Sequence, residues 1–178
     1  MGLAIVTCFI PGALREETAN AIHDAITDLP DVTWHQHVID PANDYEYGLV
    51  LRDYWDSATD DLFVIESDIV VNPDTIQSFI DCPNWYCASS YAWLTNVGPA
   101  LGCTRFRREF MQKYPDAMDE AQKRCTWRQL DVTLQRAILV RIHGEQPCVD
   151  HGIVEHLGPK GTLLPDADPT PLRELPAW

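Results

Sequence analysis

Short apolar runs alternate with longer segments of helical spacing along the first part of the chain. Residues 3–10 form a continuous apolar and β-branched run, which is typical of a strand buried on both faces. Residues 15–29 repeat apolar side chains at helical intervals and carry acids in the first turn, so they predict a helix. The same reasoning predicts a strand at 32–40, a helix at 45–58 and a third strand at 62–68.

The pattern is less regular after residue 70. Asn72 followed by Pro73 is a typical helix start, with Asn as the N-cap and Pro at the first helical position, so a short helix is expected over 73–81. The remaining expected elements are strands at 85–93, 100–106 and 152–158 and helices at 107–115 and 126–142. The proline-rich tail, residues 165–178, is expected to lack regular structure.

This order of elements predicts an α/β fold with a mostly parallel sheet flanked by helices. The chain of 178 residues suits one compact domain, which we assign to residues 1–164, followed by the tail. In such sheets, ligands bind at the carboxyl ends of the strands.

Composition narrows the class of protein. An apolar fraction of 46% with six Trp indicates a folded globular domain. No apolar run is long enough to span a bilayer, and the N-terminus lacks the basic region of a secretory signal. The six cysteines include no CxxC pair, so reduced thiols are expected. These features predict a cytoplasmic protein with no membrane partner.

Two carboxylates, Glu66 and Asp68, interrupt the apolar stretch FVIESDIVV at residues 63–71. Residues two apart project from the same side of an extended chain, roughly 6.6 Å apart along it. Two unpaired charges in an apolar setting are costly, and a divalent cation removes that cost. Oxygen ligands suit Mg²⁺ or Mn²⁺. The alternative is that both acids serve only as caps or surface charge.

At this point the sequence resembles a known family. Residues 60–76, DDLFVIESDIVVNPDTI, are similar to the core of nucleotide-sugar-dependent glycosyltransferases with the GT-A fold. The DxD motif of that family appears here as Glu66-Ser67-Asp68, with Glu in place of the first Asp. The resemblance implies that Glu66 and Asp68 bind a metal that bridges the diphosphate of a UDP-, GDP- or TDP-sugar. Because Glu66 departs from the motif and Asp68 matches it, Asp68 is the safer ligand.

Three further segments extend the resemblance over roughly residues 3–158. AIVTCFIPG is similar to the opening strand whose end contacts the donor base, which implies that Thr7, Cys8 and Phe9 bind the nucleotide. YGLVLRDYWDSATDD is similar to the helix before the DxD motif, where Arg52 matches a basic residue that faces the nucleotide. HGIVEHLG resembles the late strand on which a His, here His156, completes the metal site.

Asp131, near the start of a predicted helix, matches the place from which inverting members supply a catalytic base. Such a base deprotonates the acceptor hydroxyl. A retaining mechanism would not need it, and an ordinary first-turn helix acid is the alternative.

The basic residues are concentrated in one segment. Although the net charge is −14, nine of the 13 Lys and Arg residues lie within residues 105–141. This segment is either a solvated helix surface or an anion-binding face for a diphosphate or a nucleic-acid backbone. An isoelectric point near 4.6 argues against unselective DNA binding. The acceptor is therefore left open, with a modified DNA base or a protein as alternatives.

A different class of function is also compatible with the sequence. Cys148, His151 and His156 lie close together and offer three ligands for zinc, although their spacing matches no standard finger. The chain would then be a non-catalytic nucleotide- or zinc-binding module that recruits a partner through residues 105–141.

Overall fold

A computed structural model describes residues 2–91, 101–122, 130, 133–134, 137 and 151–157. Its strands are β1 (Leu3–Phe9), β2 (Val32–Val38), β3 (Asp61–Ile65), β4 (Ile69–Val70), β5 (Tyr86–Ala88), β6 (Ser90–Tyr91), β7 (Cys103–Phe106) and β8 (Ile153–His156). Its helices are α1 (Glu16–Ile26), α2 (Glu46–Ser57), α3 (Pro73–Asp81), α4 (Arg108–Lys113) and α5 (Ala117–Gln122).

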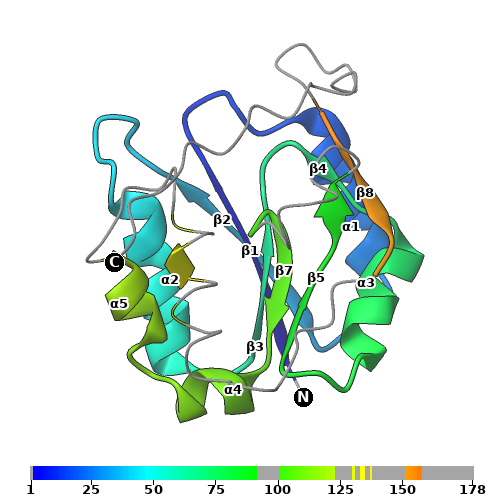
Figure 1. Ribbon diagram of the computed structural model, residues 1–178. Coiled ribbons are helices and arrows are strands. Elements are labelled where there is room, and N and C mark those ends of the chain that lie inside the picture. Colours follow the sequence, from blue (N-terminus) through cyan, green and yellow to red (C-terminus); the bar gives the residue numbers. More distant parts are fainter. Residues whose placement is uncertain are drawn as a thin grey trace.

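A five-stranded sheet of order β2-β1-β3-β7-β5 forms the centre of the molecule (Figure 1). Strands β2, β1 and β3 are parallel, whereas β7 is antiparallel to both β3 and β5. A smaller sheet of order β4-β8-β6 lies beside it. In this sheet β8, the last described strand, pairs with β4. Strand β4 follows β3 closely in the sequence.

Helices cover both faces of the central sheet, with α2 and α5 on one side and α1 and α3 on the other (Figure 1). Alternation along the strands sends side chains to the two faces in turn. Val6 and Val64 pack in the cluster that includes α2, α4 and α5. Ile5 and Phe63 pack in the cluster that includes α1 and α3. The two buried faces explain why the first and third strands are continuously apolar.

The predicted fold class is confirmed, and α3 begins and ends where the sequence predicts. Three expectations need correction. The third strand ends at Ile65, because the chain turns at Glu66. The expected strand at 85–93 is divided between the two sheets as β5 and β6. Helix α5 was not expected. Most of the expected helix at 126–142 and all of the tail lie outside the described residues.

Within the described ranges, no helix has the length and apolar character needed to cross a bilayer.

Candidate functional site at the carboxyl ends of the strands

Glu66, Ser67, Asp68 and Ile69 form a tight turn directly after β3. The amide of Ile69 donates to the carbonyl of Glu66 at 3.2 Å, which closes the turn. The amide of Glu66 still pairs with the carbonyl of Gly102 beside β3, and the amide of Arg15 donates to the carbonyl of Ser67. Backbone hydrogen bonds therefore hold the turn on two sides, to the residue before β7 and to the residue before α1.

Asp68 and His156 meet at this turn. Oδ2 of Asp68 lies 3.5 Å from Nε2 of His156, and their side chains are 35% and 17% exposed. The backbone fixes the approach, since the amide of Leu157 donates to the carbonyl of Asp68 at 2.7 Å and Ile69 pairs with His156 in the β4–β8 ladder. A carboxylate and an imidazole from distant parts of the chain thus form a partly exposed pair.

Glu66 acts electrostatically on two neighbouring thiols, Cys8 and Cys103. Burial, followed by the charges of Glu66 and Glu46, raises the pKa of the Cys8 thiol to about 12. Burial also raises the pKa of Cys103 to about 12, with Glu66 as a smaller cause. Neither thiol is a nucleophile at neutral pH, because the reactive thiolate is suppressed.

The end of β1 lies at the same edge of the sheet. Thr7 is fully buried, and its hydroxyl accepts a hydrogen bond from Nε1 of Trp34 at 3.0 Å. Cys8 is buried on the opposite face, and Phe9 is half-buried. The carbonyl of Phe9 accepts from the amide of Ile39, so β1 and β2 remain paired to their ends. Direct contact of Thr7, Cys8 and Phe9 with a nucleotide stays a prediction.

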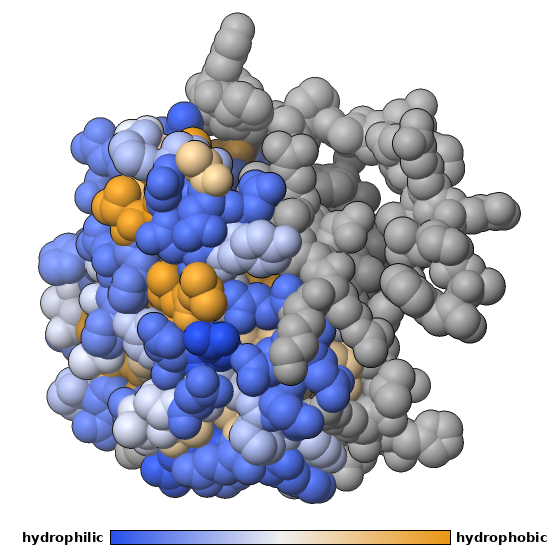
Figure 2. Space-filling model, turned by 90° about the vertical axis from the view of Figure 1, so that its left-hand side faces the viewer, coloured by the Kyte–Doolittle hydropathy of each residue, from blue (hydrophilic) through white to orange (hydrophobic). Residues whose placement is uncertain are grey.

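Four large apolar side chains near this edge are exposed in the described part of the chain. Ile10 follows β1, Val38 ends β2, and Tyr45 and Leu49 belong to the start of α2. Figure 2 views the side of the molecule that bears α2 and shows hydrophobic side chains as separate small areas on a hydrophilic surface. Apolar groups at the ends of β1 and β2 offer a surface on which a flat aromatic ring can pack.

Arg52 lies midway along α2. Its guanidinium is 3.5 Å from a carboxylate oxygen of Asp119 in α5 and 3.9 Å from that of Asp56 one turn later. These contacts join α2 to α5 at a partly exposed position, where ion pairs contribute little stability. Binding of the nucleotide by Arg52 stays a prediction. Asp131, the predicted base, lies outside the described residues, although its neighbour Leu130 is buried in the α2–α5 cluster.

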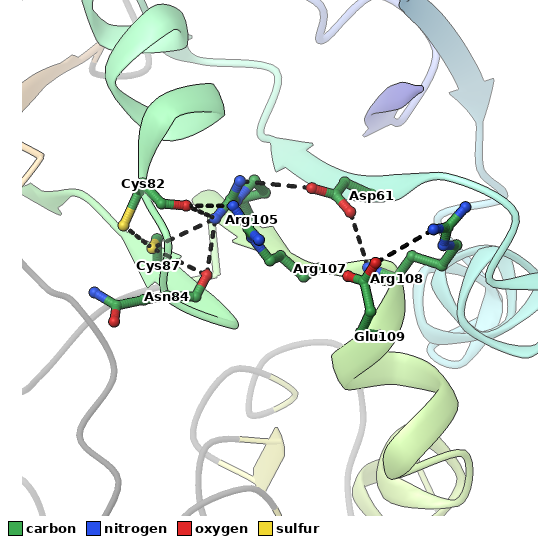
Figure 3. Close-up of polar contacts among 8 residues, drawn as sticks. All are labelled: Asp61, Cys82, Asn84, Cys87, Arg105, Arg107, Arg108 and Glu109. Carbon is green, nitrogen blue, oxygen red and sulfur yellow. Dashed lines mark hydrogen bonds and ion pairs between the residues drawn. The ribbon is translucent and has the colours of Figure 1, made fainter. Parts of the chain in front are cut away.

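The first residue of the basic segment, Arg105, does not lie on an anion-binding face. Arg105 is only 1% exposed, and its guanidinium faces Asp61 at 3.5 Å and the carbonyls of Cys82 and Asn84 at 2.8 Å (Figure 3). Arg107 donates to the same Cys82 carbonyl. The expectation is therefore wrong for Arg105, because the strand buries its side chain inside the fold.

The other two described cations of the segment also have partners within the chain. Arg108 pairs with Glu109 at 3.2 Å, and Nζ of Lys113 lies 4.1 Å from the centre of the Trp85 ring. The remaining five basic residues lie outside the described part.

The structure also separates the histidines of the predicted zinc set. His156 lies at the Asp68 turn, whereas His151 stacks on Phe79 of α3 at 4.3 Å between ring centres. The two rings therefore have different partners, one at the turn after β3 and the other beside α3. Cys148 lies outside the described residues. His151 instead lies near Cys82 and Cys87, a cluster that sequence reasoning missed, although the CPNWYC spacing after a helix was visible.

Comparison with known proteins supports the fold. No protein-family model matches the chain, and no curated protein matches it in sequence. A solved glycosyltransferase involved in glycosylation of the major capsid of PBCV-1 shares 14% identity with a TM-score of 0.61, over 84% of this chain and 82% of its own. Glucosyl-3-phosphoglycerate synthase from Mycobacterium tuberculosis, solved with phosphoglyceric acid, shares 14% identity with a TM-score of 0.55, over 88% and 72%. The chain has the α/β, GT-A-like fold of these enzymes.

Proposed function

We propose that the protein is a metal-dependent glycosyltransferase that moves a sugar from a nucleotide-sugar donor to an acceptor hydroxyl. The observation that carries the proposal is the pairing of Asp68 with His156 at the carboxyl end of β3. A GT-A-like fold supports glycosyl transfer, and its ligand edge is where this pair lies.

The donor set fits a divalent cation. Asp68 and His156 offer a carboxylate oxygen and an imidazole nitrogen 3.5 Å apart, both partly exposed, and Glu66 lies two residues before Asp68 in the same turn. Carboxylates suit Mg²⁺ and Mn²⁺, while imidazole is a poor ligand for Mg²⁺, so the mixed set favours Mn²⁺. When bound, such an ion would neutralise charge on the departing nucleoside diphosphate.

The remaining roles follow from position in the fold. The apolar side chains Ile10, Val38 and Tyr45 would hold the donor base at the ends of β1 and β2. In an inverting reaction, Asp131 would accept the proton of the acceptor hydroxyl.

The acceptor is proposed to be a hydroxyl on a macromolecule, either a protein or a modified DNA base. The described cations of the basic segment, Arg105, Arg107, Arg108 and Lys113, already have partners within the chain, which favours the protein. Salt-sensitive binding of DNA would favour the modified base instead.

Thermal unfolding tests the donor site. The protein is heated with UDP, GDP, TDP or CDP, with Mn²⁺, without it, and with EDTA. A ligand at a hundred times its dissociation constant adds about 2.7 kcal/mol, which corresponds to a rise of roughly 5–11 °C for a chain of this size. We expect such a rise for one nucleotide, and only with Mn²⁺. Release of the nucleoside diphosphate from the matching nucleotide-sugar then measures turnover.

Two variants locate the metal. Asp68→Asn should remove both the metal-dependent rise and turnover, whereas Asp74→Asn, an exposed acid in the first turn of α3, should keep both. Unchanged activity in Asp68→Asn would exclude the metal site. If no nucleotide shifts the unfolding temperature, the chain is better explained as a non-catalytic binding module.

A further inference from the structure

Three side chains of types that bind metals converge on the α1–α3 side of the fold. None of them belongs to the turn that carries Asp68. Cys82 caps the end of α3, Cys87 lies in β5, and His151 precedes β8. One ligand atom from each lies within 4.8 Å of the others. Both cysteines are buried, and His151 is half-buried. The two thiols are not joined, since their sulfur atoms are 2.9 Å apart and a disulfide bond measures about 2.05 Å.

We propose that Cys82, Cys87 and His151 bind a zinc ion. Thiolate sulfur and imidazole nitrogen are the ligands that tetrahedral zinc prefers, and thiolates exclude the hard cations that suit the Asp68 turn. Two thiolates also balance the charge of a divalent ion. Three protein ligands leave the fourth position to water.

Hydrogen bonds around His151 prepare the correct ring nitrogen. The hydroxyl of Ser78 donates to the carbonyl of Thr75 at 2.7 Å, which uses its only proton. Ser78 Oγ lies 3.1 Å from Nδ1 of His151, so Oγ must accept from Nδ1–H. The lone pair of the ring is therefore on Nε2, the tautomer that binds a metal while its other nitrogen is held by a hydrogen bond. Stacking on Phe79 fixes the ring plane.

A buried cation favours the thiolate form of the cysteines. Nη2 of Arg105 lies 3.9 Å from Sγ of Cys87 and donates to the carbonyl of Cys82 (Figure 3). A guanidinium beside a thiol favours the deprotonated sulfur, which is the form that binds zinc. Arg105 thereby supports both cysteines, through the sulfur of one and the backbone of the other.

The ion would join segments that are far apart in the sequence. Its ligands come from α3, β5 and the residue before Gly152, which leads into β8. Zinc would therefore anchor the strand that carries His156. The proposal does not depend on the proposed glycosyl transfer, because the zinc site can be tested by metal binding alone.

Metal titration of the full chain tests the proposal. The protein is reduced, stripped of metal and titrated with Zn²⁺ against a chromophoric chelator, and separately with Co²⁺. We expect one ion per chain, a sulfur-to-cobalt charge-transfer band, and release of about two protons per zinc because both thiols deprotonate. Zinc should also raise the unfolding temperature.

Variants assign the ligands. Cys82→Ser, Cys87→Ser and His151→Ala should each weaken zinc binding by more than about 100-fold, and Ser78→Ala by about 10- to 100-fold. The matched control is Cys103→Ala, which removes a buried thiol of the same hydrophobic cluster and should leave affinity unchanged. Circular dichroism reports whether each variant folds. If a cysteine variant does not fold, Ser78→Ala still tests the site.

Three outcomes would overturn the proposal: no zinc binding by the reduced protein, binding that survives in folded Cys82→Ser and Cys87→Ser, or a cobalt spectrum without a thiolate band. A protein that binds no zinc and, on mild oxidation, yields a peptide pair linked through Cys82 and Cys87 would instead have a disulfide at this place.

Discussion

Arg105 and Asp61 show how much a single residue depends on its surroundings. Both are buried, Arg105 in β7 and Asp61 at the start of β3. Asp61 also accepts a hydrogen bond from the amide of Arg108, at the start of α4, at 2.9 Å. The pair therefore connects the sheet to the first turn of a helix and to the loop after α3, where Arg105 binds two carbonyls. A charge in this position is tolerated only while each partner remains.

Replacing Arg105 by Ala should lower the free energy of unfolding by about 3–5 kcal/mol, because it leaves the Asp61 charge buried without its partner. Urea unfolding of the reduced, metal-free protein measures the loss and separates it from any effect on zinc. Arg108→Ala, which removes an exposed pair with Glu109, should change stability by less than about 1 kcal/mol. Equal stability of Arg105→Ala and Arg108→Ala would contradict the buried pair.

Local chemistry alone specifies helix α3. Asn72 accepts a hydrogen bond from the amide of Thr75 at 2.8 Å, and Pro73 occupies the first turn, as expected from the sequence. Because the cap involves only neighbouring residues, the sequence predicted the start of this helix. The strand expected at 85–93 is the contrary case. Its division between two sheets depends on β7 and β8, which are distant in the chain.

The cap has a measurable contribution. Asn72→Ala should lower the free energy of unfolding by about 1 kcal/mol, because the amide of Thr75 loses its acceptor. Asn72→Gly should lower the free energy of unfolding by only a few tenths of a kcal/mol, since Gly is favourable at an N-cap. Chemical denaturation of the three proteins side by side provides the measurement. An Ala variant as stable as the natural protein would show that the side-chain cap is unimportant.

At the scale of the whole molecule, buried thiols couple folding to alkaline pH. Cys8 packs in the cluster on the α2 face of the sheet, and Cys103 packs in the cluster on the α1–α3 face. Burial raises the pKa of each thiol from 9.0 to about 12. The unfolded chain therefore releases these protons above about pH 9 while the folded chain keeps them. The stabilisation is complete below pH 9 and is lost as the pH rises toward 12.

The free energy of unfolding should accordingly fall by up to about 1.4 kcal/mol per pH unit for each thiol above pH 9. Urea midpoints at pH 8 and pH 10, measured with a reductant, test this. The double variant Cys8→Ala, Cys103→Ala is the control, because other groups titrate in the same range. Its stability should decline less steeply than that of the natural protein. Identical declines would show that these thiols do not control the alkaline transition.

The sequence by itself determined the features that depend on neighbours along the chain. The strands β1 and β3, the cap of α3 and the placement of Glu66 and Asp68 after a buried strand all follow from local patterns. Only the tertiary structure decided which distant side chains meet. It brings Asp68 beside His156, it buries Arg105, and it groups Cys82 with His151, which no pattern indicated. The reason is physical: periodicity reports which face of an element a residue occupies, whereas the partner on that face depends on how the sheets and helices pack.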